Sequence, residues 1–101
     1  HAFIALCGSS PAYVFMFIEA MADAGVKRGL PRVKAYKLAE QATLGSAKLA
    51  LETGKHPGVL KDEVCSPGGT TIEAVIDLEK NGFRNTVMSA VEKCADKSKN
   101  M

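Results

Sequence analysis

The stretch PAYVFMFIEAMADA, residues 11–24, decides how the rest of this sequence is interpreted, because it is apolar on every side of a helix. Ser9 and Ser10 precede Pro11, and a hydroxyl N-cap followed by proline in the first turn is a common helix start. Gly25 then stands where a helix usually ends. We therefore predict a helix over residues 11–24.

Glycines and prolines divide the rest of the chain into further helical stretches. No Asn-Gly hairpin lies between alternating runs, and β-branched residues rarely cluster, so strands are not indicated. One expected helix has Pro31 in its first turn and ends at Gly54. Two shorter helices are expected over roughly residues 57–64 and 71–80, and a last helix begins after Gly82. The sequence predicts an all-α domain over residues 1–101.

The apolar helix over residues 11–24 also predicts a partner chain. A surface helix of a small monomer would have one polar face, and this helix has none. A chain of 101 residues has too little interior to surround such a helix. We predict a helical bundle that forms an intertwined homodimer, and the alternative is a compact monomeric bundle with this helix at its centre.

Composition excludes several classes of protein. The net charge of +2 is spread over both signs, so no footprint for nucleic acid is expected. The three cysteines are odd in number and far apart, which is typical of free thiols in a reducing compartment such as the cytoplasm. We expect no signal peptide, no apolar run of membrane length and hence no membrane partner. The start without Met, already in an apolar segment, we interpret as a fragment of a longer chain.

The run Ser66-Pro67-Gly68-Gly69-Thr70-Thr71 is the candidate binding site. Pro67 fixes the approach of the chain, and the two glycines permit positive φ and leave backbone N–H groups uncovered. Thr70 or Thr71 is expected to cap the next helix, and the spacing from Thr70 to Glu73 fits a capping box. Open amides at a helix N-terminus bind small anions, here a carboxylate. The same residues are also compatible with a tight turn and a cap alone.

A longer pattern surrounds this run. The segment HPGVLKDEVCSPGGTTI, residues 56–72, is followed by Leu78-Glu79 and Gly82-Phe83-Arg84, and it resembles the signature of pyrroline-5-carboxylate reductases. The segment GSSPAYVF, residues 8–15, is similar to a Ser-Gly-Ser-Gly-Pro-Ala-Tyr segment of that family. The resemblance covers nearly the whole chain.

The resemblance implies the C-terminal dimerisation domain of an enzyme that reduces pyrroline-5-carboxylate to proline with NAD(P)H. It implies homodimers, with larger oligomers of dimers as a further state. It also implies an N-terminal Rossmann domain, for which this chain carries no GxGxxG fingerprint, so the fragment alone is expected to be inactive.

The resemblance further assigns residues. Substrate-binding roles fall on Ser66, Gly68, Gly69, Thr70 and Thr71, and the Thr71 hydroxyl is expected near the ring nitrogen, as the catalytic residue. Contacts to the nicotinamide end of the cofactor fall on Gly8, Ser9, Ser10 and Pro11, although Cys7 and Ser10 depart from the serine and glycine usual in the family.

Two other functions of the chain, different from this reductase, remain open. One is a non-catalytic helical interaction module in which residues 66–71 are only a cap, and the other is a related dinucleotide-dependent dehydrogenase acting on a different small acid. His56, without cysteine or carboxylate neighbours at ligand spacing, is interpreted as structural rather than as a metal ligand, and no metal site is predicted.

Overall fold

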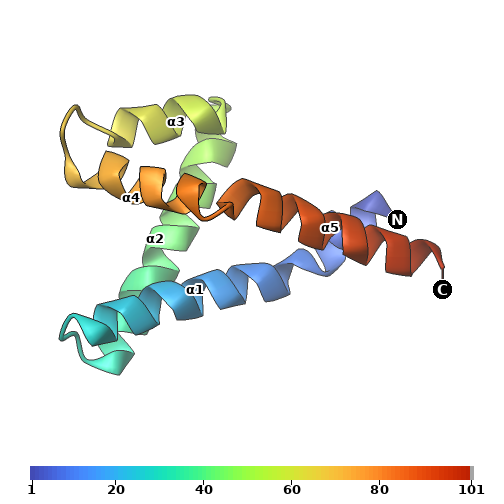
Figure 1. The fold of residues 1–101 in the computed structure, drawn as a ribbon, viewed down its shortest axis with the longest axis horizontal. Coiled ribbons are helices and arrows are strands. Elements are labelled where there is room, and N and C mark those ends of the chain that lie inside the picture. The colour runs from blue at the N-terminus through green and yellow to red at the C-terminus, as the bar shows by residue number, and fades with distance from the viewer. Residues whose placement is uncertain (101) are drawn as a thin grey trace. The chain divides into compact units, whose positions relative to one another are not determined.

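The computed structural model describes residues 1–100, whose regular structure consists of helices joined by short turns (Figure 1). Among them no strand occurs, so the predicted all-α class is confirmed. A short π-helix is followed by five α-helices: η1 (Ile4–Gly8), α1 (Ser10–Lys27), α2 (Arg32–Thr53), α3 (Pro57–Val64), α4 (Thr70–Lys80) and α5 (Phe83–Lys99). The helices divide into two compact units, Ser10–Gly54 and His1–Ser9 with the chain from Lys55 onward, and each unit is described by itself.

The unit Ser10–Gly54 is a pair of helices, α1 and α2, that pack through very small side chains. Ala22 of α1 and Ala35 and Ala39 of α2 are its buried apolar residues. A Cβ on Gly25 would lie 3.5 Å from the Ala35 Cβ and 3.2 Å from Leu30 Cδ1. Small residues at these positions therefore let the two backbones approach closely.

The turn between α1 and α2 lies later in the chain than the sequence pattern predicts. Gly25 is helical, and the residue in the left-handed region is Gly29, with φ of +108°. The Leu30 N–H donates to the Gly25 carbonyl at 3.0 Å, and the Gly29 N–H donates to the Val26 carbonyl at 3.0 Å. This is a Schellman motif, so Gly25 as the helix end is a wrong prediction by four residues.

An ion pair also joins α1 and α2 beside this turn. Arg32 Nη1 donates to Asp23 Oδ1 at 2.8 Å, and both side chains are exposed. The hydrogen bond to Asp23 raises the pKa of Arg32 above its ordinary value. Because folding raises the pKa of Arg32, the stabilisation from this side chain is fully present below the ordinary pKa of arginine and is lost only as the pH rises above it. The pair is therefore constant over the pH range in which the protein can be assayed.

The N-terminal helical stretch is more continuous and more apolar than predicted. Ser9 has helical dihedral angles, φ −98° and ψ −26°, so no extended N-cap separates η1 from α1. Residues Ile4–Lys27 form one helical stretch that is long and apolar enough, by length and composition, to span a membrane. An 18-residue window within it has a mean hydropathy of 1.4, and 6% of that window is buried. The expectation of no such run was wrong, because the apolar residues before Ser9 join the helix.

The second unit is built around a helical hairpin. Helices α3 and α4 run in opposite directions, and the turn from Cys65 to Gly69 joins them (Figure 1). Gly82, with φ of +76°, then leads into α5, and the Glu79–Arg84 ion pair spans this second turn at 3.0 Å. Helix η1 packs against α5, where Ala5 is fully buried. His1 Nδ1 lies 3.5 Å from Ser98 Oγ, so both described ends of the chain belong to this unit.

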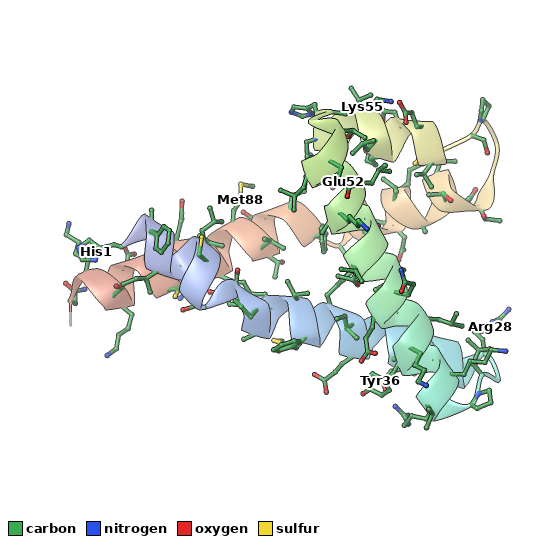
Figure 2. The ribbon with its side chains drawn as sticks, turned by 180° about the vertical axis from the view of Figure 1, so that it is seen from behind. His1, Arg28, Tyr36, Glu52, Lys55 and Met88 are labelled. Atoms are coloured by element: carbon green, nitrogen blue, oxygen red, sulfur yellow. The ribbon has the colours of Figure 1, made fainter. Side chains whose placement is uncertain are left out.

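Large apolar side chains remain on the surface of both units. The four buried apolar residues are alanines, and among residues 1–100 no large side chain is fully buried. Side chains stand off the helices on most sides, Met88 of α5 among them (Figure 2). Exposed fractions reach 64% for Phe15, 66% for Met16 and 84% for Leu51. Such a surface is typical of a chain that is completed by a partner.

Candidate functional site

The predicted site at residues 66–71 is the turn that begins α4. The Gly69 N–H donates to the Ser66 carbonyl at 3.1 Å, which closes a four-residue turn. Pro67 and Gly68 occupy its centre, and Gly68 has φ of +70°. Proline followed by a residue at positive φ is the pattern of a type II turn. The turn brings all five predicted substrate-binding residues into one short loop.

Gly69 is the N-cap residue of α4, which corrects the expected cap by Thr70 or Thr71. Its dihedral angles, φ −84° and ψ 178°, are extended, and it has no side chain that could cap. Thr70 is already the first helical residue, so the proposed capping box from Thr70 to Glu73 is out of register by one residue. The amides that a capping side chain would satisfy are left open.

Those open amides belong to the first turn of α4. The N–H groups of Thr70, Thr71 and Ile72 have no acceptor among residues 1–100, as expected for an uncapped helix start. They carry the positive end of the helix dipole. Thr70 is exposed and Thr71 is half-buried, so solvent or a ligand can reach this end of the helix.

Hydroxyl groups distinguish this helix start from two others in the chain. Helices α2 and α5 also begin without a side-chain cap, at Pro31 and Gly82. Of these three helices, only α4 combines open amides with serine and threonine in both the preceding turn and the first helical turn. The hydroxyls of Ser66, Thr70 and Thr71 make no hydrogen bond within residues 1–100. Together these groups are donors for a small anion.

Ser66 and Gly69 face each other across the turn. A Cβ built on Gly69 would lie 2.7 Å from Ser66 Oγ and 3.3 Å from the Ser66 carbonyl oxygen. The first distance is shorter than two unbonded atoms tolerate. Gly69 therefore leaves the space that the Ser66 hydroxyl occupies, in addition to starting the helix.

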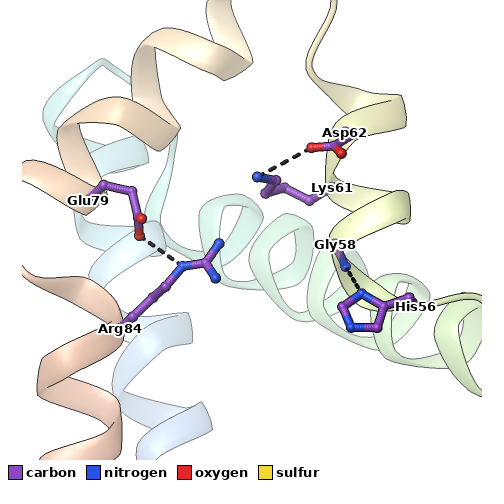
Figure 3. Close-up of polar contacts among 6 residues, drawn as sticks. All are labelled: His56, Gly58, Lys61, Asp62, Glu79 and Arg84. Carbon is purple, nitrogen blue, oxygen red and sulfur yellow. Dashed lines mark hydrogen bonds and ion pairs between the residues drawn. The ribbon is translucent and has the colours of Figure 1, made fainter.

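The start of α3, in the same hairpin, is arranged in the opposite way. His56 is its N-cap residue, and His56 Nδ1 accepts a hydrogen bond from the Gly58 N–H at 3.0 Å (Figure 3). The structural role predicted for His56 is therefore specific: it is a side-chain cap. The proline that follows it, Pro57, has no N–H to satisfy.

Several charges near the loop form ion pairs, whereas Glu73, in the first turn of α4, is in no ion pair among residues 1–100. Lys55 lies 3.2 Å from Glu63. Lys61 lies 3.3 Å from Asp62, and Arg84 lies 3.0 Å from Glu79 (Figure 3). Residues 66–71 themselves carry no charged side chain. An anion at the loop would be held by amides and hydroxyls, which suits a single carboxylate better than a multiply charged phosphate.

The predicted cofactor-contact residues lie at a junction of two helices. Gly8 is the last residue of η1, and the Ser9 N–H donates to the Ile4 carbonyl at 2.9 Å, an i→i+5 bond. Ser10 and Pro11 open α1. A π-helical turn here was not predicted from the sequence, and such turns are frequent at functional sites.

A small all-helical domain whose large apolar side chains stay exposed belongs to the class of helical domains that carry an interaction surface. Comparison with known proteins narrows the class. The family model described as pyrroline-5-carboxylate reductase dimerisation matches residues 1–101. The chain belongs to this family.

Several similar proteins are named pyrroline-5-carboxylate reductase. The chain is 64% identical over 101 residues to "Pyrroline-5-carboxylate reductase" of Escherichia coli (strain K12), covering 100% of this chain and 38% of that protein. It is 57% identical over 96 residues to the Arabidopsis thaliana protein of that name, covering 95% of this chain and 35% of that protein. The chain thus spans little more than a third of the curated relatives it matches.

Solved structures agree with the fold. The chain is similar to 1-pyrroline-5-carboxylate reductase from Streptococcus pyogenes, with a TM-score of 0.96 and 47% identity over 99% of this chain and 39% of that one. It is also similar to the Plasmodium falciparum pyrroline carboxylate reductase with NADP bound, with a TM-score of 0.94 and 43% identity over 98% of this chain and 38% of that one. The helical arrangement is therefore that of a known reductase domain.

Proposed function

We propose that this chain is the substrate-binding and dimerising part of an enzyme that reduces pyrroline-5-carboxylate to proline with NAD(P)H. The observation that carries the proposal is the start of α4, where three open amides and three hydroxyls meet in a single loop. The family match and the names of its relatives support the identity of the anion that this loop receives.

The substrate carboxylate lies at the Ser66–Thr71 loop in this proposal. Amides at the N-terminus of α4 and the hydroxyls of Ser66 and Thr70 donate to its oxygens. Gly68 permits the turn, and Gly69 leaves room for the Ser66 hydroxyl. Hydrogen bonds to a charged group are worth about 1.5–3 kcal/mol each, so a few suffice for a metabolite of this size.

The reaction adds a hydride and a proton across the C=N bond of the ring. NAD(P)H, when bound, supplies the hydride to the imine carbon and leaves as NAD(P)⁺. The ring nitrogen gains the electron pair of the C=N bond and must end protonated. The Thr71 hydroxyl donates or relays that proton at the nitrogen, while the other loop residues keep the ring in place.

The cofactor requires a second domain, which supplies most of its contacts. In this chain Gly8, Ser9, Ser10 and Pro11 would face only the nicotinamide end, and the absence of a side chain on Gly8 suits a close approach. The Plasmodium falciparum relative solved with NADP bound supports a dinucleotide of this kind. We also propose a cytoplasmic homodimer, in which the exposed apolar side chains of α1 are covered by the second copy.

The test is a substitution at Thr71 in the full-length reductase that carries this domain. Thr71→Ala is expected to lower kcat/KM for pyrroline-5-carboxylate by about 100-fold, the lower end of what one positioned proton donor contributes. Thr71→Ser keeps the hydroxyl and is expected to retain most of the activity. Thr86→Ala, at an exposed threonine in the first turn of α5, is the matched control. Unchanged kcat/KM in Thr71→Ala would refute this role.

A further inference from the structure

We propose that His56 is a positioning residue for the Ser66–Thr71 loop: its imidazole caps α3, and α3 holds the beginning of the loop. The inference rests on the proposed function, because it concerns the loop assigned to the substrate. It adds a residue that does not touch the substrate and that acts only while Nδ1 of the ring can accept a hydrogen bond.

His56 alone satisfies the start of α3. Its Nδ1 accepts from the Gly58 N–H at 3.0 Å, and its carbonyl accepts from the Val59 N–H at 2.9 Å and the Leu60 N–H at 3.2 Å. Pro57 has no N–H. The N–H groups of Gly58, Val59 and Leu60, in the first turn of the helix, are therefore all bound to one residue.

Gly58 is matched to this cap. A Cβ on Gly58 would lie 3.0 Å from His56 Nδ1 and 3.3 Å from His56 Cε1. Both distances are tighter than ordinary side-chain contacts, so a larger residue at 58 would push the ring away from the amide. The lack of a side chain at Gly58 thus lets the imidazole lie over the helix start (Figure 3).

The cap matters for the loop because α3 is short. The helix has eight residues, which is too few for a helix to be stable by propensity alone. Its end leads directly into the loop: the N–H of Cys65, the C-cap residue, donates to the Asp62 carbonyl at 3.1 Å, and Ser66 follows. Loss of the cap would loosen the segment that fixes where Ser66 begins.

The chemistry of the cap makes it dependent on the protonation state of the ring. A neutral imidazole accepts at one nitrogen, whereas a protonated imidazole carries hydrogen on both nitrogens and cannot accept. His56 is exposed, and the charged side chains around it along the chain, from Glu52 to Asp62, are paired: Glu52 with Lys48, Lys55 with Glu63, and Lys61 with Asp62. An asparagine at 56 would accept through its amide oxygen at any pH.

The test compares wild type, His56→Asn and His56→Ala in the full-length reductase between about pH 5.5 and 8, where histidine side chains change charge. The ratio of KM values, wild type to His56→Asn, cancels the titration of the substrate. We expect this ratio to rise about five-fold toward acid pH, the effect of one lost N-cap. In His56→Ala, KM should be about five-fold higher than in His56→Asn throughout this pH range, with kcat within two-fold of wild type.

Amide NMR of the same proteins, labelled at glycine, provides a second readout. The Gly58 signal and the loop signals of Gly68 and Gly69 should move with one midpoint in wild type and stay constant in His56→Asn. A flat KM ratio, or a titrating Gly58 signal with unmoved loop signals, would overturn the proposal. If His56→Ala is silent while Ser66→Ala raises KM, only this inference fails, and if Ser66→Ala is silent too, the proposed substrate loop fails.

Discussion

Replacing Gly69 by alanine tests whether the Ser66 hydroxyl is placed for the substrate. The new Cβ would lie 2.7 Å from Ser66 Oγ, which is not a tolerable contact, and 3.3 Å from the Ser66 carbonyl oxygen. Ser66 Oγ ends a short side chain and can rotate away. The turn therefore survives in Gly69→Ala, but the hydroxyl leaves its position.

The magnitude follows from what is lost. Alanine is a poorer N-cap than glycine, so we expect a decrease in the free energy of unfolding of about 0.5–1 kcal/mol. A hydrogen bond to a carboxylate is worth about 1.5–3 kcal/mol, so its loss raises KM for pyrroline-5-carboxylate by about 10- to 150-fold. The effect on substrate binding should thus exceed the effect on stability.

Steady-state kinetics of the full-length reductase provide the assay, with KM for both substrates and a melting temperature for each variant. KM for NAD(P)H should stay within two-fold of wild type, because Gly69 lies in the substrate loop. Gly45→Ala is the matched control, since Gly45 lies within α2 and no atom lies within 4 Å of an added Cβ. That variant should keep both KM values.

A double-mutant cycle gives the refuting result. Ser66→Ala removes the hydroxyl that the new methyl group would displace, so Gly69→Ala should cost little more in that background, and the two effects should be strongly non-additive. If KM in Gly69→Ala stays within two-fold of wild type, or if the two effects simply add, the Ser66 hydroxyl is not held against the substrate by this turn.

Two further predictions concern the loop backbone and the apolar surface. Gly68→Ala and Gly54→Ala both place a side chain at positive φ, +70° and +66°, in open space. Each substitution should therefore lower the free energy of unfolding by about 1–2 kcal/mol. Only Gly68→Ala should also raise KM for the imine substrate. Equal effects on KM would contradict the assignment of the loop. Phe15→Glu, at a side chain that is 64% exposed in the single chain, should weaken the homodimer by at least about 1,000-fold, because each copy forfeits about 2–3 kcal/mol of apolar burial. Analytical ultracentrifugation that finds an intact dimer would show that α1 is covered in some other way.

Most of the fold could be predicted from the sequence because its punctuation is local. Helix α3 begins at Pro57 and ends at Val64 as the pattern indicates, and Gly54 ends α2 in the left-handed region. One error arose where either of two glycines could end a helix. Gly25 and Gly29 both fit a helix end, and only the packing of Gly25 against Ala35 assigns it to the helix interior.

The candidate site was predictable as a set of residues but not as a geometry. The pattern of proline, two glycines and two threonines indicates an anion-binding turn, and the structure brings these residues into one loop. The register of the cap could not be read from the pattern, because Gly69, Thr70 and Thr71 are all acceptable N-cap residues. The contact between Ser66 Oγ and the space over Gly69 depends on a side-chain position that no sequence spacing encodes.

The two helix starts of the α3–α4 hairpin show why the loop is better explained by binding than by stability. At α3, the N–H groups of Gly58, Val59 and Leu60 are bound to His56. At α4, a serine or aspartate at position 69 would cap the helix and stabilise it by roughly a few tenths of a kcal/mol relative to glycine, yet any side chain there would collide with Ser66 Oγ. Glycine at 69 gives up that stabilisation and keeps both the open amides and the Ser66 hydroxyl. A turn selected only to join two helices would have no reason to forgo the cap.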